Sequence, residues 1–298
     1  MEIQIVEFFK SWSCKFCDVL FSFTNILGED LFFYLIFFAL YWMYDKRFAY
    51  KYGLVYFSSC IFNMGFKKLV RRPRPIGATA SGYSFPSGHS QSYSTVVTGL
   101  IYEANKKKFP EKRWQRIEFL TECIVVGLLV GIGRMYWGQH YLTDVLAGLI
   151  LGVVFTVVAT YLIDVIISRS KMSLDKFFLI MAPILIVAYI VIVSTNLFND
   201  VDTLAKVYRA IGLTLSVIVG YFADKKWIKY STEDTMKNKM SKMIAGSATL
   251  MMIYSFVLRD LAVNAVYPIY YFAVGLIATI ALPWIFKTIK NPVESSKE

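Results

Sequence analysis

The sequence predicts an all-α protein that crosses a membrane several times, from its composition and from where its apolar residues fall. Of its 298 residues, 56% are hydrophobic and 18% are charged, against roughly 45–50% and 25% in a soluble globular domain. Apolar residues gather in long runs, and the run from Val145 to Ile167 contains one charge, Asp164. Such a chain is neither disordered nor a disulfide scaffold, and an ordinary soluble enzyme is disfavoured.

The first 27 residues form the first predicted element, an amphipathic helix at the membrane interface. Apolar residues recur there at helical spacing, and charged residues fall between them. The apolar positions are Val6, Phe9, Phe16, Leu20 and Phe23. A true first membrane span is the alternative.

Nine apolar runs follow, and we predict a membrane helix in each, although many are slightly shorter than the roughly 20 residues a span needs. They cover residues 31–44, 51–66, 91–104, 118–133, 143–166, 177–196, 208–223, 243–258 and 265–286. Three glycines in the later runs, Gly212, Gly220 and Gly275, are typical of positions where membrane helices pack closely.

Positive charges predict the orientation of these helices. If residues 45–51 are cytoplasmic and the spans alternate, cytoplasmic segments hold 21 of the 32 lysines and arginines, as the positive-inside rule favours. Cytoplasmic loops and one outward cluster explain the net charge of +11 without a continuous basic face, so no nucleic-acid partner is expected. Six further cations cluster on the outer side, at Arg134 and within residues 67–74. They form either a solvated basic loop or a site for an anion at the membrane face.

The chain has two histidines, and both fall on the predicted outer side. The first ends the run Pro86-Ser87-Gly88-His89, just before an apolar stretch. Pro86 suits a helix start, where the backbone N–H groups of the first turn bind anions readily. Gly88 lets an anion approach the backbone closely, and the Ser87 hydroxyl adds a donor. A capped helix with a surface histidine is the simpler alternative.

The second histidine, His140, lies four residues before Asp144. On a helix, residues at this spacing share a face. A carboxylate beside an imidazole fixes its tautomer and stabilises the cation that forms when the other nitrogen attacks. The pair therefore indicates a histidine nucleophile, unless it only caps a helix.

A third polar stretch runs from Lys67 to Pro75. Its prolines end the preceding helix and stiffen the loop. Lys67 and Arg74 could reach one anion together, because arginine matches a phosphate with two donors and lysine supplies a point charge. Anionic lipid head groups are another ligand for such a stretch.

Together the three stretches resemble the three-part signature of the type 2 phosphatidic acid phosphatase (PAP2) superfamily of integral membrane lipid phosphatases. The first part is a lysine, six residues and Arg-Pro, which Lys67, Arg74 and Pro75 match. The second part is Pro-Ser-Gly-His, matched at residues 86–89.

The third part is Ser-Arg, five residues, His, three residues and Asp. Arg134, His140 and Asp144 match it in register, but Gly133 stands where a serine is usual. This departure puts one hydroxyl contact in question and leaves the mechanism in place. The resemblance covers roughly residues 25–165.

The resemblance implies a phosphatase that needs no metal or other cofactor. His140 would attack phosphorus in line and form a phosphohistidine, while Asp144 orients it. His89, as imidazolium, would protonate the leaving oxygen and later help to activate water. Five groups would hold the equatorial phosphate oxygens, where the charge of the transition state lies: Lys67, Arg74, Ser87, Gly88 and Arg134.

We therefore expect an interfacial segment at 1–27, a PAP2-like catalytic membrane core at 28–167 and additional C-terminal membrane helices at 168–298. The expected substrate is a lipid phosphate or a polyprenyl diphosphate, with undecaprenyl diphosphate the leading candidate if the chain is bacterial. We expect a multi-pass protein of the cell membrane with an extracytoplasmic site. A phosphotransferase, or a transporter or scaffold that reuses the anion site, stays an open alternative, and so does the oligomeric state.

Overall fold

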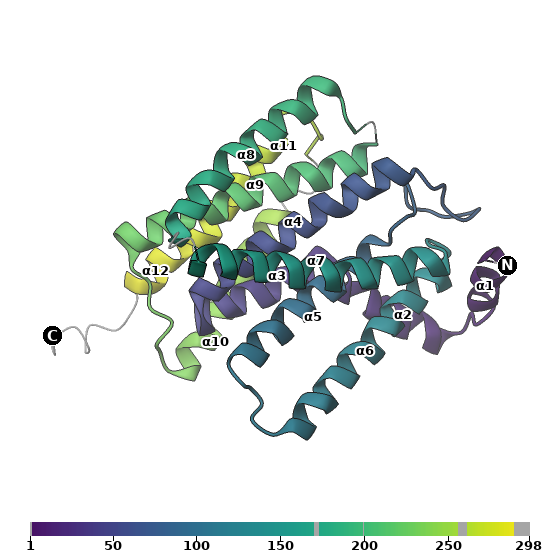
Figure 1. The fold of residues 1–298 in the computed structure, drawn as a ribbon, viewed down its shortest axis with the longest axis horizontal. Coiled ribbons are helices and arrows are strands. Elements are labelled where there is room, and N and C mark those ends of the chain that lie inside the picture. The colour runs from purple at the N-terminus through teal and green to yellow at the C-terminus, as the bar shows by residue number, and fades with distance from the viewer. Residues whose placement is uncertain (1, 170–172, 199, 256–260, 289–298) are drawn as a thin grey trace. The chain divides into compact units, whose positions relative to one another are not determined.

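The computed structural model describes residues 2–169, 173–198, 200–255 and 261–288. Helices joined by loops make up this described part, which contains no strand (Figure 1), so the predicted all-α fold class is confirmed. The helices are α1 (Glu2–Lys10), α2 (Lys15–Leu27), α3 (Asp30–Ala39), η1 (Leu40–Tyr44), α4 (Lys46–Val70), α5 (Gly88–Lys106), α6 (Arg113–Tyr136), α7 (Leu142–Arg169), α8 (Leu174–Thr195), α9 (Val201–Ala223), η2 (Asp224–Ile228), α10 (Met236–Ile253), α11 (Tyr267–Leu276), η4 (Ile277–Ala281) and α12 (Leu282–Thr288).

Contacts divide the chain into two compact units. The first comprises Met1–Tyr34, Ser58–Ser170 and Phe198–Lys206, and it holds every predicted site residue. The second comprises Leu35–Phe57, Lys171–Leu197 and Val207–Glu298. Three of the boundaries fall inside helices α3, α4 and α9.

The predicted multi-span membrane protein is confirmed. Four segments are long and apolar enough to cross a membrane: α7, α8, Val201–Ile228 and Tyr267–Thr288. The pair α2 and α3–η1, bent by 55°, also passes as a broken span or re-entrant loop. Helices α4, α5, α6 and α10, where we expected further spans, do not meet the same length and hydropathy criteria. Helix α5 is less apolar because it buries polar side chains such as Gln91 and Thr95 against other helices.

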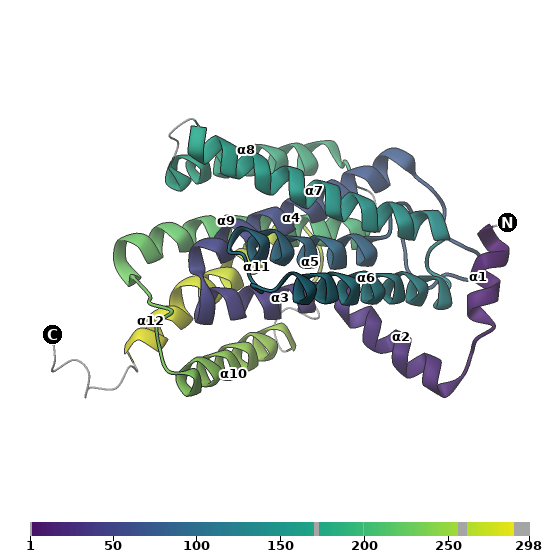
Figure 2. The same cartoon turned by 60° about the horizontal axis from the view of Figure 1, so that its bottom comes forward.

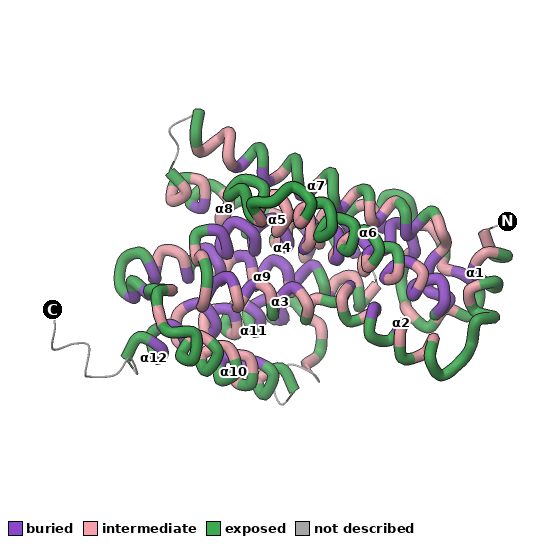
Figure 3. Tube along the Cα trace, turned by 90° about the horizontal axis from the view of Figure 1, so that it is seen from below, coloured by how far each residue is buried: buried purple, intermediate pink, exposed green. Residues whose placement is uncertain are grey.

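Exposed side chains on the membrane helices are largely apolar. On α7, Ile150 is 61% exposed and Tyr161 is 54% exposed, and Figure 3 shows exposed positions recurring along this helix. On α8, Ile184 and Val187 are exposed in the same way. Such surfaces suit contact with lipid, whereas a soluble protein rarely leaves so much contiguous apolar surface in water.

The N-terminal segment forms two helices instead of the single amphipathic helix that we expected. Helix α1 ends at Lys10, and α2 starts after Cys14, whose Sγ accepts the backbone N–H of Cys17 at 3.3 Å. This cap satisfies a first-turn donor and so allows a new helix to begin. Helices α1 and α2 both pack on α6 (Figure 2), and Phe16 and Phe23 stay exposed.

The close approach of α5 and α7 positions the predicted site. A Cβ atom at Gly148 of α7 would lie 2.5 Å from the carbonyl oxygen of Ser87, and one at Gly152 would lie 2.1 Å from Oγ of Ser94. Real Cβ atoms do not come so close, so only glycine permits this helix spacing. It places the N-terminus of α5 against the first turn of α7.

A buried polar network joins α4 to α5. The Gln91 amide nitrogen donates to Oγ and to the carbonyl oxygen of Ser59, both at 3.0 Å. Asn63 donates to the Gln91 amide oxygen at 2.8 Å. Buried polar groups need such partners, and the network therefore fixes the register of the two helices beneath the site.

The second unit packs through the glycines that the sequence suggested. A Cβ at Gly212 would lie 2.3 Å from the carbonyl oxygen of Pro268, and one at Gly275 would lie 1.8 Å from Oγ of Ser216. Helices α9 and α11 therefore meet along small residues, in the manner common in membranes.

Candidate active site

His140 and Asp144 lie together, although not on one helix face as we expected. His140 lies in the loop before α7, and Asp144 is in the first turn of α7. Nδ1 of His140 is 3.5 Å from Oδ2 of Asp144, and both side chains are buried. The same Oδ2 accepts the backbone N–H of Tyr141 at 2.9 Å. The carboxylate therefore caps its own helix and also faces the imidazole, which leaves Nε2 as the nitrogen free to react.

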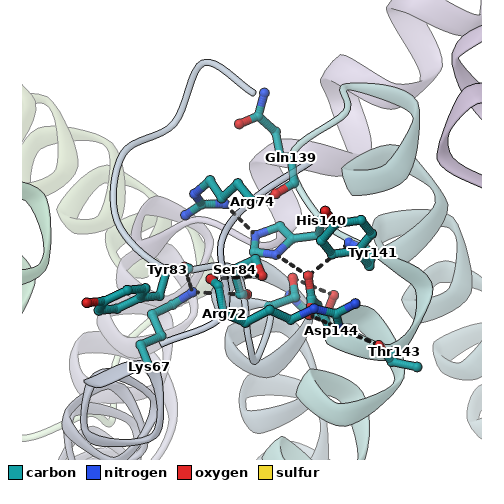
Figure 4. A network of polar contacts seen from close by, with 12 residues as sticks. Lys67, Arg72, Arg74, Tyr83, Ser84, Gln139, His140, Tyr141, Thr143 and Asp144 are labelled. Carbon is teal, nitrogen blue, oxygen red and sulfur yellow. Dashed lines mark hydrogen bonds and ion pairs between the residues drawn. The ribbon is translucent and has the colours of Figure 1, made fainter. Parts of the chain in front are cut away.

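The second nitrogen of His140 faces Arg74. Nη1 of Arg74 is 3.2 Å from Nε2 of His140 and donates to the carbonyl oxygen of Gln139 at 2.9 Å. Nε of Arg74 donates to the carbonyl oxygen of Ser81 at 2.9 Å. Figure 4 shows Arg74 and Asp144 on different sides of the His140 ring. The guanidinium is thus held by loop carbonyls where an oxyanion bound to Nε2 would need a donor.

Lys67 approaches the same place from the last turns of α4. Its side chain is buried, and Nζ donates to the carbonyl oxygens of Tyr83 at 2.7 Å and of Ser84 at 3.3 Å. The helix ends just beyond it, where Arg71 has a φ of 52° and Pro73 cannot continue a helix. Lys67 is therefore aimed by the loop between α4 and α5 (Figure 4).

Helix α5 begins one step later than we expected. Ser87 is the N-cap and Gly88 the first helical residue, so Pro86 precedes the helix. Oγ of Ser87 accepts the backbone N–H of Ser90 at 3.4 Å. The backbone N–H of Ser87 donates to the carbonyl oxygen of Asp144 at 2.9 Å. The N–H groups of Gly88 and the next residue have no partner within the helix and are available to an anion. The bond from Ser87 to Asp144 places this helix terminus against the first turn of α7.

Arg134 comes from the last turn of α6 and is buried. One of its nitrogens, Nη1, donates to Oδ1 of Asn25 on α2. Its Nε has no hydrogen-bond partner among the described residues. A buried donor without a partner is costly, and a phosphate oxygen would satisfy it.

The departure from the family pattern at Gly133 has a local cause. A Cβ at this position would lie 3.1 Å from Oγ1 of Thr24 and 3.4 Å from the ring of Phe21, both on α2. Position 133 therefore faces α2, and a serine side chain there would crowd Thr24.

Burial and positive charge set the protonation of the histidines. Burial lowers the pKa of His140 well below its ordinary value of 6.5, and Lys67, Arg74 and Arg134 lower it further. Burial lowers the pKa of His89 to about 4, against the opposing effect of Glu29. Both imidazoles are neutral at pH 7 in the free protein. That state suits His140 for attack, whereas His89 needs nearby negative charge, such as that of a phosphate, to take up a proton.

Sequence reasoning gave Arg72 no role of its own, yet it is central to the site. Its Nη1 donates to Oδ1 of Asp144 at 2.9 Å and to Oγ1 of Thr143 at 2.6 Å. It stacks over the Tyr141 ring at 4.2 Å and forms an ion pair with Glu2 on α1. Arg72 therefore holds Asp144 from the side opposite His140. The position of Arg72 in the run Arg72-Pro73-Arg74 could have indicated a role for it, but nothing in the sequence indicated Glu2.

Two acidic residues at the start of α9 reach the site loop: Asp200 just before the helix and Asp202 in its first turn. The Ser81 hydroxyl lies within hydrogen-bond distance of both carboxylates. Because the Ser81 carbonyl accepts from Arg74, these acids restrain the loop that aims Arg74. Sequence reasoning missed them because they lie more than a hundred residues away. Within the described part of the chain, no group of three His, Cys, Asp or Glu side chains could hold a metal ion.

Comparison with known families agrees with the motifs. Residues 48–168 match the PAP2 superfamily, and residues 208–293 match the transmembrane extension of PAP2 superfamily phosphatases. The chain therefore carries a PAP2 superfamily domain followed by the transmembrane extension of PAP2 superfamily phosphatases.

Two curated proteins and one solved structure are similar to parts of this chain. Phosphatidylglycerophosphatase B of Bacillus subtilis is 37% identical over 103 residues, which is 33% of this chain and 50% of that protein. Dolichyldiphosphatase of Saccharomyces cerevisiae is 32% identical over 106 residues, 31% of this chain and 42% of that protein. The chain thus spans half or less of the length of these curated relatives. A crystal structure of a transmembrane PAP2-type phosphatidylglycerolphosphate phosphatase from Bacillus subtilis is 24% identical and covers 55% of this chain and 84% of that chain, with a TM-score of 0.48.

Proposed function

We propose that the protein is a phosphatase that hydrolyses a lipid phosphate or polyprenyl diphosphate through a phosphohistidine on His140. One observation carries the proposal. The buried His140 has Nδ1 directed at the Asp144 carboxylate and Nε2 facing the Arg74 guanidinium. Such an imidazole has one nitrogen facing a carboxylate and the other beside a cation that would bind the phosphate, as nucleophilic catalysis requires.

The reaction takes place in two steps. Nε2 of His140 forms a bond to phosphorus while the bond from phosphorus to the leaving oxygen breaks, and His89 gives that oxygen a proton. Water then attacks the phosphohistidine, His89 takes a proton from it, and the bond between phosphorus and nitrogen breaks. Free phosphate and the original imidazole result. The 3.5 Å contact between His140 and Asp144 would shorten as positive charge develops on the ring.

Three cations and one helix terminus stabilise the transferred group. Lys67, Arg74 and Arg134 supply positive charge around Nε2, and Ser87 and Gly88 supply the terminus of α5. In phosphoryl transfer, this electrostatic stabilisation of the equatorial oxygens provides most of the catalysis. The unpartnered Nε of Arg134 supports the presence of an oxygen acceptor in the complex.

A lipid substrate follows from the surroundings of the site. The catalytic side chains stand at helix ends and in the loops α4–α5 and α6–α7, so a phosphate at head-group level could enter while its tail stays in the bilayer. The loop α5–α6, at the other ends of these helices, carries Lys107, Lys108 and Lys112. Under the positive-inside rule, these charges favour a cytoplasmic position for that loop and so support an extracytoplasmic site at the cell membrane.

The named relatives support a membrane lipid as substrate and leave several classes to compare. One is named for phosphatidylglycerophosphate and the other for dolichyl diphosphate. Undecaprenyl diphosphate is the polyprenyl diphosphate we place first for a bacterial chain.

The test is release of inorganic phosphate by the detergent-purified protein with chelator and no added metal. The panel holds a polyprenyl diphosphate, a diacylglycerol phosphate, phosphatidylglycerophosphate and a sphingoid phosphate, each with wild type and His140→Ala. We expect release that His140→Ala lowers by at least about a thousandfold, and the ranking identifies the lipid class. Equal release from both proteins would refute the role of His140. Vanadate binding without release by the wild type would favour a transporter or phosphotransferase.

A further inference from the structure

We propose that Glu29 is the positioning residue for His89: its carboxylate holds the imidazole that protonates the leaving oxygen. Glu29 lies between α2 and α3, outside residues 48–168 that match the PAP2 superfamily. The inference rests on the proposed function and adds to it a contribution from the N-terminal segment.

The first argument is the contact itself. Oε1 of Glu29 lies 3.9 Å from Nε2 of His89. The same oxygen accepts a hydrogen bond from the Asn25 side-chain amide at 2.9 Å. The carboxylate is therefore fixed on one side by α2 and faces the histidine on the other. With Nε2 directed at Glu29, Nδ1 remains for the leaving oxygen.

The second argument is the packing of the bend between α2 and α3 against His89. A Cβ at Gly28 would lie 2.6 Å from Cβ of His89 and 3.0 Å from its Cα. Only glycine lets the bend come this close. The bend is therefore built against the start of α5, and the position of Glu29 follows from that packing.

The third argument is that Asn25 connects two groups of the site. Its amide nitrogen donates to Glu29, and its amide oxygen accepts from Nη1 of Arg134. One side chain thus orients the carboxylate beside His89 and the guanidinium that we assign to the phosphate. An amide with both ends occupied has one orientation, so it fixes both partners.

The fourth argument is electrostatic need. Burial and the positive charges of Arg134 on α6 and Lys206 on α9 disfavour a proton on His89, and Glu29 opposes them. Among the described residues, His140 also interacts with His89, and it is neutral at pH 7. During proton donation, the substrate phosphate and Glu29 supply the negative charge near His89. Removing the Glu29 carboxylate should therefore impair proton donation by His89 more than it impairs phosphate binding or the attack by His140.

The experiment compares Glu29→Gln, Glu29→Asp and the control Glu7→Gln, which removes the same charge from an exposed position on α1. Each is assayed on a lipid phosphate with an alcohol leaving group and on a nitrophenyl phosphate, whose leaving group needs no proton. We expect Glu29→Gln to lower kcat for the lipid about 10–100-fold, part of the 10²–10⁴ that general acid catalysis provides. The nitrophenyl rate should change less than about threefold.

The pH profile gives a second measurement. For the lipid, the alkaline limb of kcat/KM should move to lower pH by about one unit in Glu29→Gln, because the imidazolium loses its carboxylate. Glu29→Asp should recover part of the lost rate, and Glu7→Gln should match the wild type.

Equal losses on both substrates with an unchanged pH profile would overturn the proposal, because they would mean that Glu29 only supports the fold. If Glu29→Gln does not fold, Glu29→Asp decides the question. That variant must then lose more activity on the lipid than on the nitrophenyl phosphate. The proposed function fails separately, if the wild type releases no phosphate from any lipid.

Discussion

At the scale of single residues, Arg72 acts one contact away from the reacting atoms. It binds Asp144, and Asp144 faces His140, so its loss should misplace the nucleophile without removing a phosphate ligand. We expect Arg72→Lys to lower kcat about tenfold or more with little change in KM, because lysine has no second nitrogen with which to bind Glu2 while the first binds Asp144 in a fixed fork. Steady-state kinetics on the preferred lipid give both constants.

The matched control is Arg71→Lys, a neighbour whose Nε donates to the carbonyl oxygen of Lys68 on the exposed surface. It should behave as the wild type. If the two variants lose kcat equally, or if Arg72→Lys changes KM alone, the positioning role of Arg72 is wrong.

The lowered pKa values of the two histidines predict the pH dependence. His140 must be neutral to attack. Because its pKa lies well below 6.5, it is already neutral at pH 6.5, and the acid limb of kcat/KM should lie at lower pH. His89 must be protonated to donate, and its pKa of about 4 means that the protonated fraction falls as pH rises. The kcat/KM optimum should therefore be acidic.

Bound phosphate adds negative charge and raises both histidine pKa values. The kcat profile, which reports the complex, should therefore peak at higher pH than the kcat/KM profile. Initial rates at saturating and limiting lipid between pH 4 and 9 separate the two. Profiles that coincide, or kcat/KM values that still rise above pH 7, would contradict the assigned roles.

The sequence alone was enough to propose Lys67, Arg74, His89, His140 and Asp144 as site residues, because the spacing of their motifs is visible without a structure; their catalytic roles stay predictions. It did not indicate Glu29, Glu2 or Asp200. Each of these acts across a tertiary contact with a residue far away in the chain, and acidic residues in amphipathic or loop segments give no pattern of their own.

At the scale of helices, the distance between α5 and α7 decides whether the two halves of the site meet. Gly148 is the residue that sets it, since a methyl group there would strike the Ser87 carbonyl, which is backbone and cannot turn aside. Gly148→Ala should therefore lower kcat at least about tenfold, because small displacements of reacting groups are costly. Its thermal midpoint should fall as well.

Gly65→Ala is the control, because Gly65 lies in α4 and a Cβ there meets nothing within 4 Å. Alanine favours a helix interior over glycine by roughly 1 kcal/mol, so this variant should be active and no less stable. If Gly148→Ala retains full kcat, the helix spacing does not position the site.

Helix content was easier to predict than helix ends. Long apolar runs gave most helices to within a few residues, since their composition leaves few other structures in a membrane. The start of α5, the break between α1 and α2 and the position of His140 ahead of α7 were not predicted as observed. Each depends on a cap, at Ser87, Cys14 or Asp144, and the cap is chosen by hydrogen bonds that composition does not reveal.

At the scale of the whole molecule, the proposed catalytic residues lie in one unit, and the N-terminal helices and the start of α9 add contacts to them. Residues 208–293 match the PAP2 transmembrane extension, and within the described part of this range α9 and α11 pack closely at Gly212 and Gly275. The family resemblance accounts for the proposed catalytic side chains. Glu2, Glu29 and Asp200, which contact Arg72, His89 and Ser81, come from outside residues 48–168.

The central claim is that His140 carries the phosphoryl group, and trapping that intermediate tests it most directly. The purified protein is mixed with a radiolabelled lipid phosphate, quenched in alkali within milliseconds and digested, and the labelled peptide is identified by mass spectrometry. We predict an acid-labile, alkali-stable label on His140 that forms and decays during turnover. His140→Ala should show none, and a variant at His89 should accumulate more with a good leaving group, because hydrolysis of the intermediate is slowed. Turnover with no label on His140, or a label on another side chain, would contradict the account.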